Sequence, residues 1–202
     1  MSSRNIREAL AAHPIIAAVH SFEDAAIAAE SPCAVVFLLG GKLFDIKQMT
    51  ERLRQRGKTV FVHLDLAEGI ARDANGVQIL AEIVRPDGVI TTKNNLVRVI
   101  REYGMLAALR CFIMDGQSYH KAVQVSGNAS PDFIELMPGI LPQSLIAEFC
   151  RETGAAVVAG GLVRSAVDAN QAFAAGAQGI STSDRSLWTL PIGADNGTRG
   201  AI

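Results

Sequence analysis

The stretches Val157-Val158-Ala159-Gly160-Gly161-Leu162 and Gly179-Ile180-Ser181-Thr182-Ser183 each end a short apolar run just before a segment with helical spacing. Paired glycines let backbone N–H groups approach an anion closely, and the N-terminus of a following helix adds unpaired donors and positive partial charge. In a β/α barrel, the loops after the seventh and eighth strands are a common place for a phosphate group. The two stretches therefore raise the question of whether six strand–helix units precede them.

Short apolar runs recur along the chain, each bounded by Gly, Pro or polar residues. We predict eight strands, at Ile15–Val19, Ala34–Leu39, Thr59–Leu64, Gly88–Thr92, Leu106–Phe112, Phe133–Leu136, Ala156–Ala159 and Gly179–Ser181. Stretches with helical spacing separate them, for example Phe44 to Arg56 and Pro142 to Thr153. Gly57 follows the first of these stretches, where a left-handed residue commonly ends a helix. The alternation predicts parallel strands joined by helical crossovers.

The length of the chain narrows the architecture. Eight units in 202 residues leave roughly 25 residues each, near the lower limit for a closed eight-stranded barrel. We predict an α/β fold, a compact eight-stranded parallel TIM-like barrel. It forms a single domain over residues 1–190, because no linker, charge block or low-complexity tract divides the chain. Residues 191–202 contain three glycines and few apolar side chains, which predicts a flexible C-terminal tail.

The composition agrees with a compact soluble protein, since 49% of the residues are hydrophobic, 19% are charged and the net charge is −1. No apolar run is long enough to span a bilayer, and the N-terminus lacks the apolar stretch of a signal peptide. We therefore expect a cytoplasmic protein with no membrane partner.

Cys33, Cys111 and Cys150 are far apart and lack C-x-x-C spacing, so we expect buried thiols rather than disulfides or a zinc site.

Polar side chains gather where the strands are expected to end, which is the face on which β/α barrels place their chemistry. His63 and Asp65 are two residues apart at the end of the third strand, so their side chains should point to one face. Three roles are compatible with this pair. It could orient a ligand hydroxyl, act as base and orienter in an enzyme, or close the barrel mouth as an internally hydrogen-bonded polar layer.

Glu135 is a carboxylate within an apolar strand, where an unpaired charge would be costly. Arg110, at a comparable position one strand away, is the partner that we expect for it. Either the pair contacts a ligand hydroxyl or it is a plain buried ion pair.

The closing loops are predicted to bind a phosphate group through Gly160, Gly161, Thr182 and Ser183, with help from Arg164. One such loop alone would be weak evidence, because Gly-Gly ends many strands and Ser or Thr before a helix is ordinary capping. Their occurrence together at the seventh and eighth positions favours an anion site. We expect no metal and no required cofactor.

The same stretches, taken in order, resemble a known family. They are His13 to Ala18, His63 to Leu66 with Gly69 and Asp73, Gly88 to Thr92, Ile134 to Gly139 followed by Pro142, Ala159 to Gly161, and Ser181 to Ser183 with Leu187 and Trp188. This pattern, from about His13 to Trp188, is similar to that of the glycerol-3-phosphate-responsive antiterminators. Where that family is expected to carry glutamine before the arginine of the fifth strand, this chain has Leu109.

The resemblance implies a regulator rather than a catalyst. Proteins of that family bind glycerol 3-phosphate and then act on the leader of a glycerol-utilisation messenger RNA, preventing premature termination and stabilising the transcript. The implied effector is glycerol 3-phosphate, and the implied partner is an mRNA leader. By the same resemblance, the phosphate loops hold the phosphate end, and the glycerol end would lie against His63, Asp65, Arg110 and Glu135.

Composition alone does not predict RNA binding. The chain has 19 basic and 20 acidic residues, and aromatic residues make up 5% of it. Basic residues gather at Arg52 to Lys58 and at Lys93 to Arg101, on helix-like segments where a solvated face is the commoner explanation. The alternative function is a small phosphosugar enzyme, such as an isomerase, aldolase or phosphodiesterase, because this fold hosts many of them.

Two further expectations concern assembly and switching. The Ala-rich segments Ala25 to Ala29 and Ala172 to Ala177 either form a homodimer interface or pack closely on the barrel. The stretches Gly40 to Leu43 and Asp65 to Gly76 are the candidate switching loops, because they are polar or glycine-bearing at the expected barrel mouth.

Overall fold

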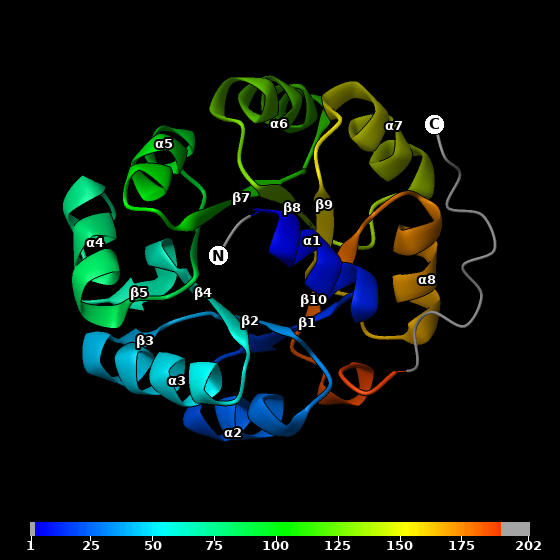
Figure 1. The fold of residues 1–202 in the computed structure, drawn as a ribbon. Helices are drawn as coiled ribbons and strands as arrows, with labels where there is room; N and C mark the ends of the chain where they lie inside the picture. The colour runs from blue at the N-terminus through cyan, green and yellow to red at the C-terminus, as the bar shows by residue number, and fades with distance from the viewer. Residues whose placement is uncertain (1–2, 191–202) are drawn as a thin grey trace.

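The computed structural model describes residues 3–190, which form a closed barrel of eight parallel strands surrounded by helices (Figure 1). The barrel strands are β1 (Ile15–Val19), β2 (Val35–Leu38), β4 (Thr59–His63), β6 (Gly88–Thr91), β7 (Leu106–Phe112), β8 (Phe133–Met137), β9 (Val157–Gly160) and β10 (Gly179–Thr182). The predicted fold class is confirmed, and no predicted strand end is off by more than one residue. The tail predicted at residues 191–202 lies outside the described residues.

One helix precedes the first strand, and the others lie between successive barrel strands. They are α1 (Ser3–Ala12), α2 (Phe22–Glu30), α3 (Leu43–Gln55), α4 (Ala74–Ile79), α5 (Asn94–Glu102), α6 (Gly116–Ala129), α7 (Gln143–Thr153) and α8 (Ala166–Ala174). A π-helical turn, η2 (Leu80–Val84), continues α4, and 3-10 turns form η1 (Leu64–Leu66) and η3 (Arg185–Leu187). Gly57 follows α3 with φ of +75°, the left-handed conformation expected there.

The strands follow one another around the barrel in chain order, and β1 pairs with β10 to close it. Ile16 is level with Ser181 across that closing pair, and Arg110 is level with Glu135 between β7 and β8. All eight strands therefore end at one face, so residues that follow different strands meet at the barrel mouth.

The lower barrel is filled by apolar side chains and closed by α1, a helix that the sequence patterns did not predict. Ile6 and Leu10 of α1 are buried against the inward side chains of the strands, and α1 lies across the barrel in Figure 1. Above this floor, Phe37, Phe61 and Phe133 form a triangle of rings with centroids 5.2 to 5.9 Å apart. The aromatic layer separates the apolar floor from the mouth.

The alternate residues of each strand face the surrounding helices. Leu109, at the position where glutamine was expected, is buried in that outer layer, so its side chain points away from the barrel interior. Ala25, Ala28 and Ala172 are likewise buried between helices and barrel. Close packing on the barrel therefore accounts for these alanines, and the homodimer stays a prediction.

Two short strands tie the candidate switching loops together. β3 (Gly41–Lys42) and β5 (Ala67–Glu68) pair as a separate two-stranded parallel sheet. The placement of Asp65 on a strand was wrong. β4 ends at His63, and Asp65 lies in the 3-10 turn η1, where the chain bends toward β5.

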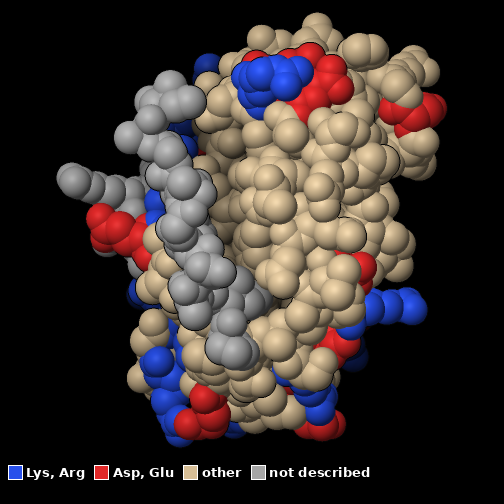
Figure 2. Space-filling model, turned by 90° about the vertical axis from the view of Figure 1, so that its right-hand side faces the viewer, with Lys and Arg blue, Asp and Glu red and all other residues tan. Residues whose placement is uncertain are grey.

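The flank on the right of Figure 1, which carries α7 and α8, shows few charged side chains across its middle (Figure 2). Blue and red side chains gather instead near its upper and lower ends.

Among residues 3–190, no helix combines the length and the apolar character that a membrane crossing requires. All three cysteines are free thiols; Cys33 and Cys111 are buried, and Cys150 is half-buried.

Gly88, the first residue of β6, has no room for a side chain inside the barrel. A Cβ placed there would lie 2.2 Å from the Phe61 ring. We expect Gly88→Ala to lower the free energy of unfolding by about 1–3 kcal/mol, because the ring must leave its place in the aromatic triangle. Gly127→Ala is the control, since it adds a Cβ to α6 with no atom within 4 Å. Urea unfolding that showed equal stability for the two variants would contradict this packing.

Candidate functional site

A layer of polar side chains lies above the aromatic triangle, inside the mouth of the barrel. Arg110 donates from Nε to Glu135 Oε2 at 2.6 Å, and the Ser181 hydroxyl donates to Glu135 Oε1 at 2.7 Å. Glu135 is fully buried, and Arg110 is 7% exposed. The expected pairing of Arg110 with Glu135 is confirmed, and both oxygens of the carboxylate have partners.

Gly160 makes room for this network. A Cβ on Gly160 would lie 2.4 Å from Glu135 Oε1, so only glycine leaves space for the carboxylate at this level. Gly160 is the last residue of β9, next to this carboxylate. Its contact with Glu135 accounts for this glycine independently of any bound phosphate.

His63 lies in the same layer as a buried and incompletely partnered imidazole. It is 2% exposed, and its Nδ1 has no hydrogen-bond partner. Burial lowers the pKa of His63 to about 4, helped by the positive charge of Arg110 and opposed by Asp65. The imidazole is therefore neutral at physiological pH.

Asp65 lies close to His63 without forming a short contact. The distance from His63 Nδ1 to Asp65 Oδ2 is 3.9 Å, and that oxygen accepts a hydrogen bond of 2.7 Å from the Thr92 N–H. The two side chains are neighbours as expected. Through this hydrogen bond, Asp65 links the loop after β4 to the loop after β6.

An open pocket of about 520 Å³ lies at the mouth, beside the two closing loops. Of the predicted site residues, Arg110, Gly161, Thr182 and Ser183 line it, and so does Arg164. His63, Asp65, Glu135 and Gly160 are not among its lining residues. They form or support the layer around it.

The loop after β9 has an unusual backbone. Gly161 has φ of +75°, and the next residue, Leu162, has φ of +62° although it carries a branched side chain. A left-handed leucine is uncommon, and such conformations persist where the surroundings enforce them, often at ligand sites. Within residues 3–190, no turn or loop hydrogen bond uses the backbone N–H groups of Leu162 and Ser183. The loops therefore offer donors to an anion in the pocket.

The helix N-termini contribute less than the sequence suggested. Ser165 caps α8 by accepting from the Asp168 N–H, and Asp184 accepts from the N–H and hydroxyl of Ser186 in η3. The Thr182 hydroxyl donates to the carbonyl of Val163. The chain's own side chains thus occupy both N-termini, which leaves the loop N–H groups and nearby cations for a ligand.

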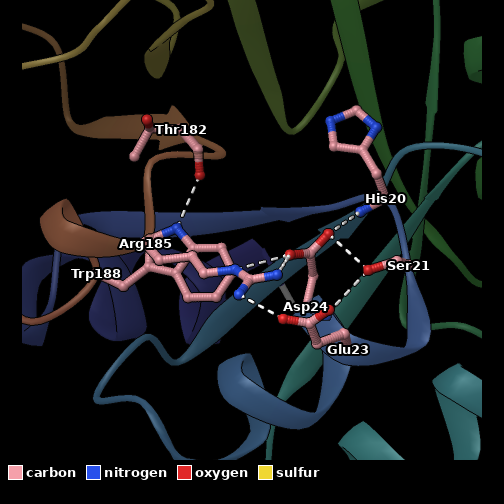
Figure 3. Close-up of polar contacts among 7 residues, drawn as sticks. All are labelled: His20, Ser21, Glu23, Asp24, Thr182, Arg185 and Trp188. Atoms are coloured by element: carbon pink, nitrogen blue, oxygen red, sulfur yellow. Dashed lines mark hydrogen bonds and ion pairs between the residues drawn. The ribbon is translucent and has the colours of Figure 1, made fainter.

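Two features of the mouth were not among the predicted site residues. His20, which follows β1, lines the pocket, and its ring points away from the cluster below it (Figure 3). Arg185 in η3 binds Asp24 and Glu23 of α2, a pairing across more than 160 residues. Only the position of His20 after a strand could have indicated it, and nothing local marks the Arg185 pairing.

Within the described part of the chain, no three His, Cys, Asp or Glu side chains converge in a way that could hold a metal ion. Three basic residues, His20, Arg110 and Arg164, line the pocket, with Asp184 as its acidic residue. This set of groups suits a small anion that also carries hydroxyl groups.

Comparison with known proteins points in one direction. The family model of the glycerol-3-phosphate responsive antiterminators matches residues 15–188. The crystal structure of the glycerol uptake operon antiterminator regulatory protein of Listeria monocytogenes is 31% identical. It has a TM-score of 0.82 and covers 87% of this chain and 95% of its own. An antiterminator-related protein of Thermotoga maritima is 29% identical with a TM-score of 0.76, over 86% of this chain and 96% of its own.

Other similarities are less informative about function. The uncharacterized protein YgcP of Escherichia coli K12 is 33% identical over 180 residues, which is 88% of this chain and 93% of that protein. A deoxyribose phosphate aldolase of Aeropyrum pernix has a TM-score of 0.68 at 17% identity, which shows a shared fold alone. With the family match over nearly all of the described residues, the chain belongs to the glycerol-3-phosphate responsive antiterminator family.

Proposed function

We propose that this protein binds glycerol 3-phosphate in the pocket at the barrel mouth and, in response, acts on the leader of a glycerol-utilisation messenger RNA. The observation that supports it most is the pair of closing loops. They border one pocket with the backbone N–H groups of Leu162 and Ser183, which form no loop hydrogen bond, and with Arg164; Arg110 of β7 lines the same pocket. Such an arrangement suits a phosphate monoester, because charge-assisted hydrogen bonds are the stronger ones. The family membership supports the choice of effector.

The phosphate end of the ligand is assigned to the closing loops. Leu162 and Ser183 would donate backbone N–H groups, Gly161 and Thr182 border the same space, and Arg164 would supply charge. Gly160 acts indirectly, because it leaves room for the Glu135 carboxylate.

The glycerol end is assigned to the polar layer. Arg110 borders the pocket, held there by Glu135, and neutral His63 lies in the same layer with an unused Nδ1. Glu135 and Asp65 then act by fixing Arg110 and the β6 loop. Removing one member of the buried pair would leave the other charge without a partner. This would lower the free energy of unfolding by about 3–5 kcal/mol.

The enzyme alternative remains less supported. The fold is shared with phosphosugar enzymes, and no lysine is among the pocket-lining residues in the part of the chain that the structure describes. Chemistry through a Schiff base therefore lacks its amine at this pocket.

Effector binding can be tested with a charge placed in the closing loop. We expect Gly161→Asp to weaken glycerol 3-phosphate binding in isothermal titration on the order of 100-fold, because a carboxylate would face the phosphate. Gly154→Asp is the matched control: Gly154 also has a left-handed backbone, φ of +60°, but it ends α7 away from the pocket. Equal binding by the two variants would argue against this site.

The regulatory role can be tested with RNA. We expect a gel shift of the leader RNA of a glycerol-utilisation operon from the same organism when glycerol 3-phosphate is present, and no such response with Gly161→Asp. An unrelated RNA of equal length is the control, because phosphate contacts alone bind any sequence. In parallel, ³¹P NMR should show glycerol 3-phosphate unchanged after long incubation. Conversion to a new phosphorus species, without an RNA shift, would favour an enzyme.

The neutral state of His63 can be tested through stability. Its folded pKa of about 4 lies below the ordinary value of 6.5, so the unfolded chain takes up a proton first as the pH falls. Stability should therefore drop between pH 7 and pH 5, by roughly 2 kcal/mol more in the wild type than in His63→Gln. Urea unfolding at both pH values measures this. Parallel losses in the two proteins would show that His63 titrates normally.

A further inference from the structure

The loop after β10 supplies two residues of the pocket and is fastened to a distant part of the chain. Ser183 and Asp184 line the pocket, and the next residue is Arg185. Its guanidinium donates to Asp24 Oδ1 from Nε at 2.9 Å and from a terminal nitrogen at 2.6 Å, and to Glu23 Oε1 at 2.8 Å. Figure 3 shows the guanidinium reaching from η3 toward the first turn of α2.

Asp24 connects this guanidinium to a second part of the pocket. While its Oδ1 accepts from Arg185, its Oδ2 accepts from the backbone N–H of His20 at 3.1 Å and from the Ser21 hydroxyl at 3.0 Å. Burial alone would raise the pKa of the Asp24 carboxyl, but the Arg185 and His20 donors more than offset it and hold that pKa below its usual value. The carboxylate is thus charged, and it bridges two pocket-lining segments.

The side chain of His20 is directed away from this bridge. Its backbone is held by Asp24, and its ring points away from Asp24 and Arg185 in Figure 3. Within residues 3–190, no other side chain or backbone group forms a hydrogen bond with the ring. His20 borders the same pocket as Ser183 and Arg164, so its ring nitrogens are available to a ligand there.

We expect this bridge to contribute little to the stability of the fold. Arg185 is 40% exposed, and its partners Glu23 and Asp24 are 74% and 17% exposed; ion pairs that solvent reaches add little to stability. The base of the loop has its own anchor in Trp188, which is fully buried and donates from Nε1 to the Thr182 carbonyl at 2.8 Å. The role of Arg185 is therefore to fix the position of the loop after β10 relative to the segment after β1, which form two sides of the pocket.

We propose that His20 is a further ligand-contacting residue and that Arg185 is its positioning residue, acting through Asp24. This inference rests on the proposed function for the identity of the ligand, a phosphate monoester with hydroxyl groups. The bridge orders the pocket before the ligand binds. This raises the affinity, because binding then costs less conformational entropy. His20 then supplies a hydrogen bond to the phosphate that neither closing loop provides.

The test measures affinity for glycerol 3-phosphate and, separately, for inorganic phosphate by isothermal titration. The variants are His20→Ala, Arg185→Ala, their double variant and Arg185→Lys. Arg98→Ala is the matched control, because Arg98 forms an exposed ion pair with Glu102 at 3.0 Å on α5. Thermal unfolding of each protein checks that the fold is intact, and we expect Arg185→Ala to melt within about 3 °C of wild type.

We expect each single alanine variant to bind glycerol 3-phosphate roughly tenfold more weakly, and the double variant to be no weaker than that. Such non-additivity is the mark of one residue acting through the other. Arg185→Lys should recover part of the loss, and Arg98→Ala should bind as wild type does. Wild-type affinity in either single variant, or losses that multiply in the double variant, would overturn the inference.

The two phosphate probes separate this inference from the proposed function. A wild-type protein that binds inorganic phosphate but not glycerol 3-phosphate would refute the effector, and the same variants would then be compared with phosphate alone. A wild-type protein that binds neither would overturn both.

Discussion

The ion pair between Arg110 and Glu135 determines where the apolar core of this barrel ends and where its pocket begins. Below it, the barrel is filled by the aromatic triangle and closed by α1. Above it, the guanidinium borders open space. Charges this deep persist only when each has a partner, and here the third participant is the Ser181 hydroxyl from the strand that closes the barrel. The network therefore joins β7, β8 and β10.

Several features of the site follow from that network. Gly160 is glycine because the Glu135 carboxylate occupies the space beside it. His63 stays neutral because it is buried near a guanidinium. In the closing loops, in contrast, the distinctive feature is the backbone conformation, with two successive left-handed residues at Gly161 and Leu162. The polar layer is thus built by side chains, whereas the shape of the loop after β9 is set by its backbone.

Much of the fold could be predicted from the sequence, because the strands of a covered parallel sheet are nearly continuous apolar runs ended by Gly, Pro or polar residues. The pairing of Arg110 with Glu135 was predictable for the same reason, since a charge inside such a run must find a neighbour in register. The helix α1 was not, because its role depends on Ile6 and Leu10 meeting a barrel floor that no local pattern describes. Asp65 was misplaced because two residues beyond a strand can turn as easily as extend. The Arg185 contacts with α2 join residues too far apart for spacing rules to link.

The pairing of β3 with β5 has a mechanical consequence. The loop that follows β2 and the loop that follows β4 share backbone hydrogen bonds, so they are joined as one unit rather than two separate loops. Asp65, just before β5, connects the start of the loop after β6 to this unit through the Thr92 N–H. Moving any one of these three connections would therefore require the other two to move or these hydrogen bonds to break.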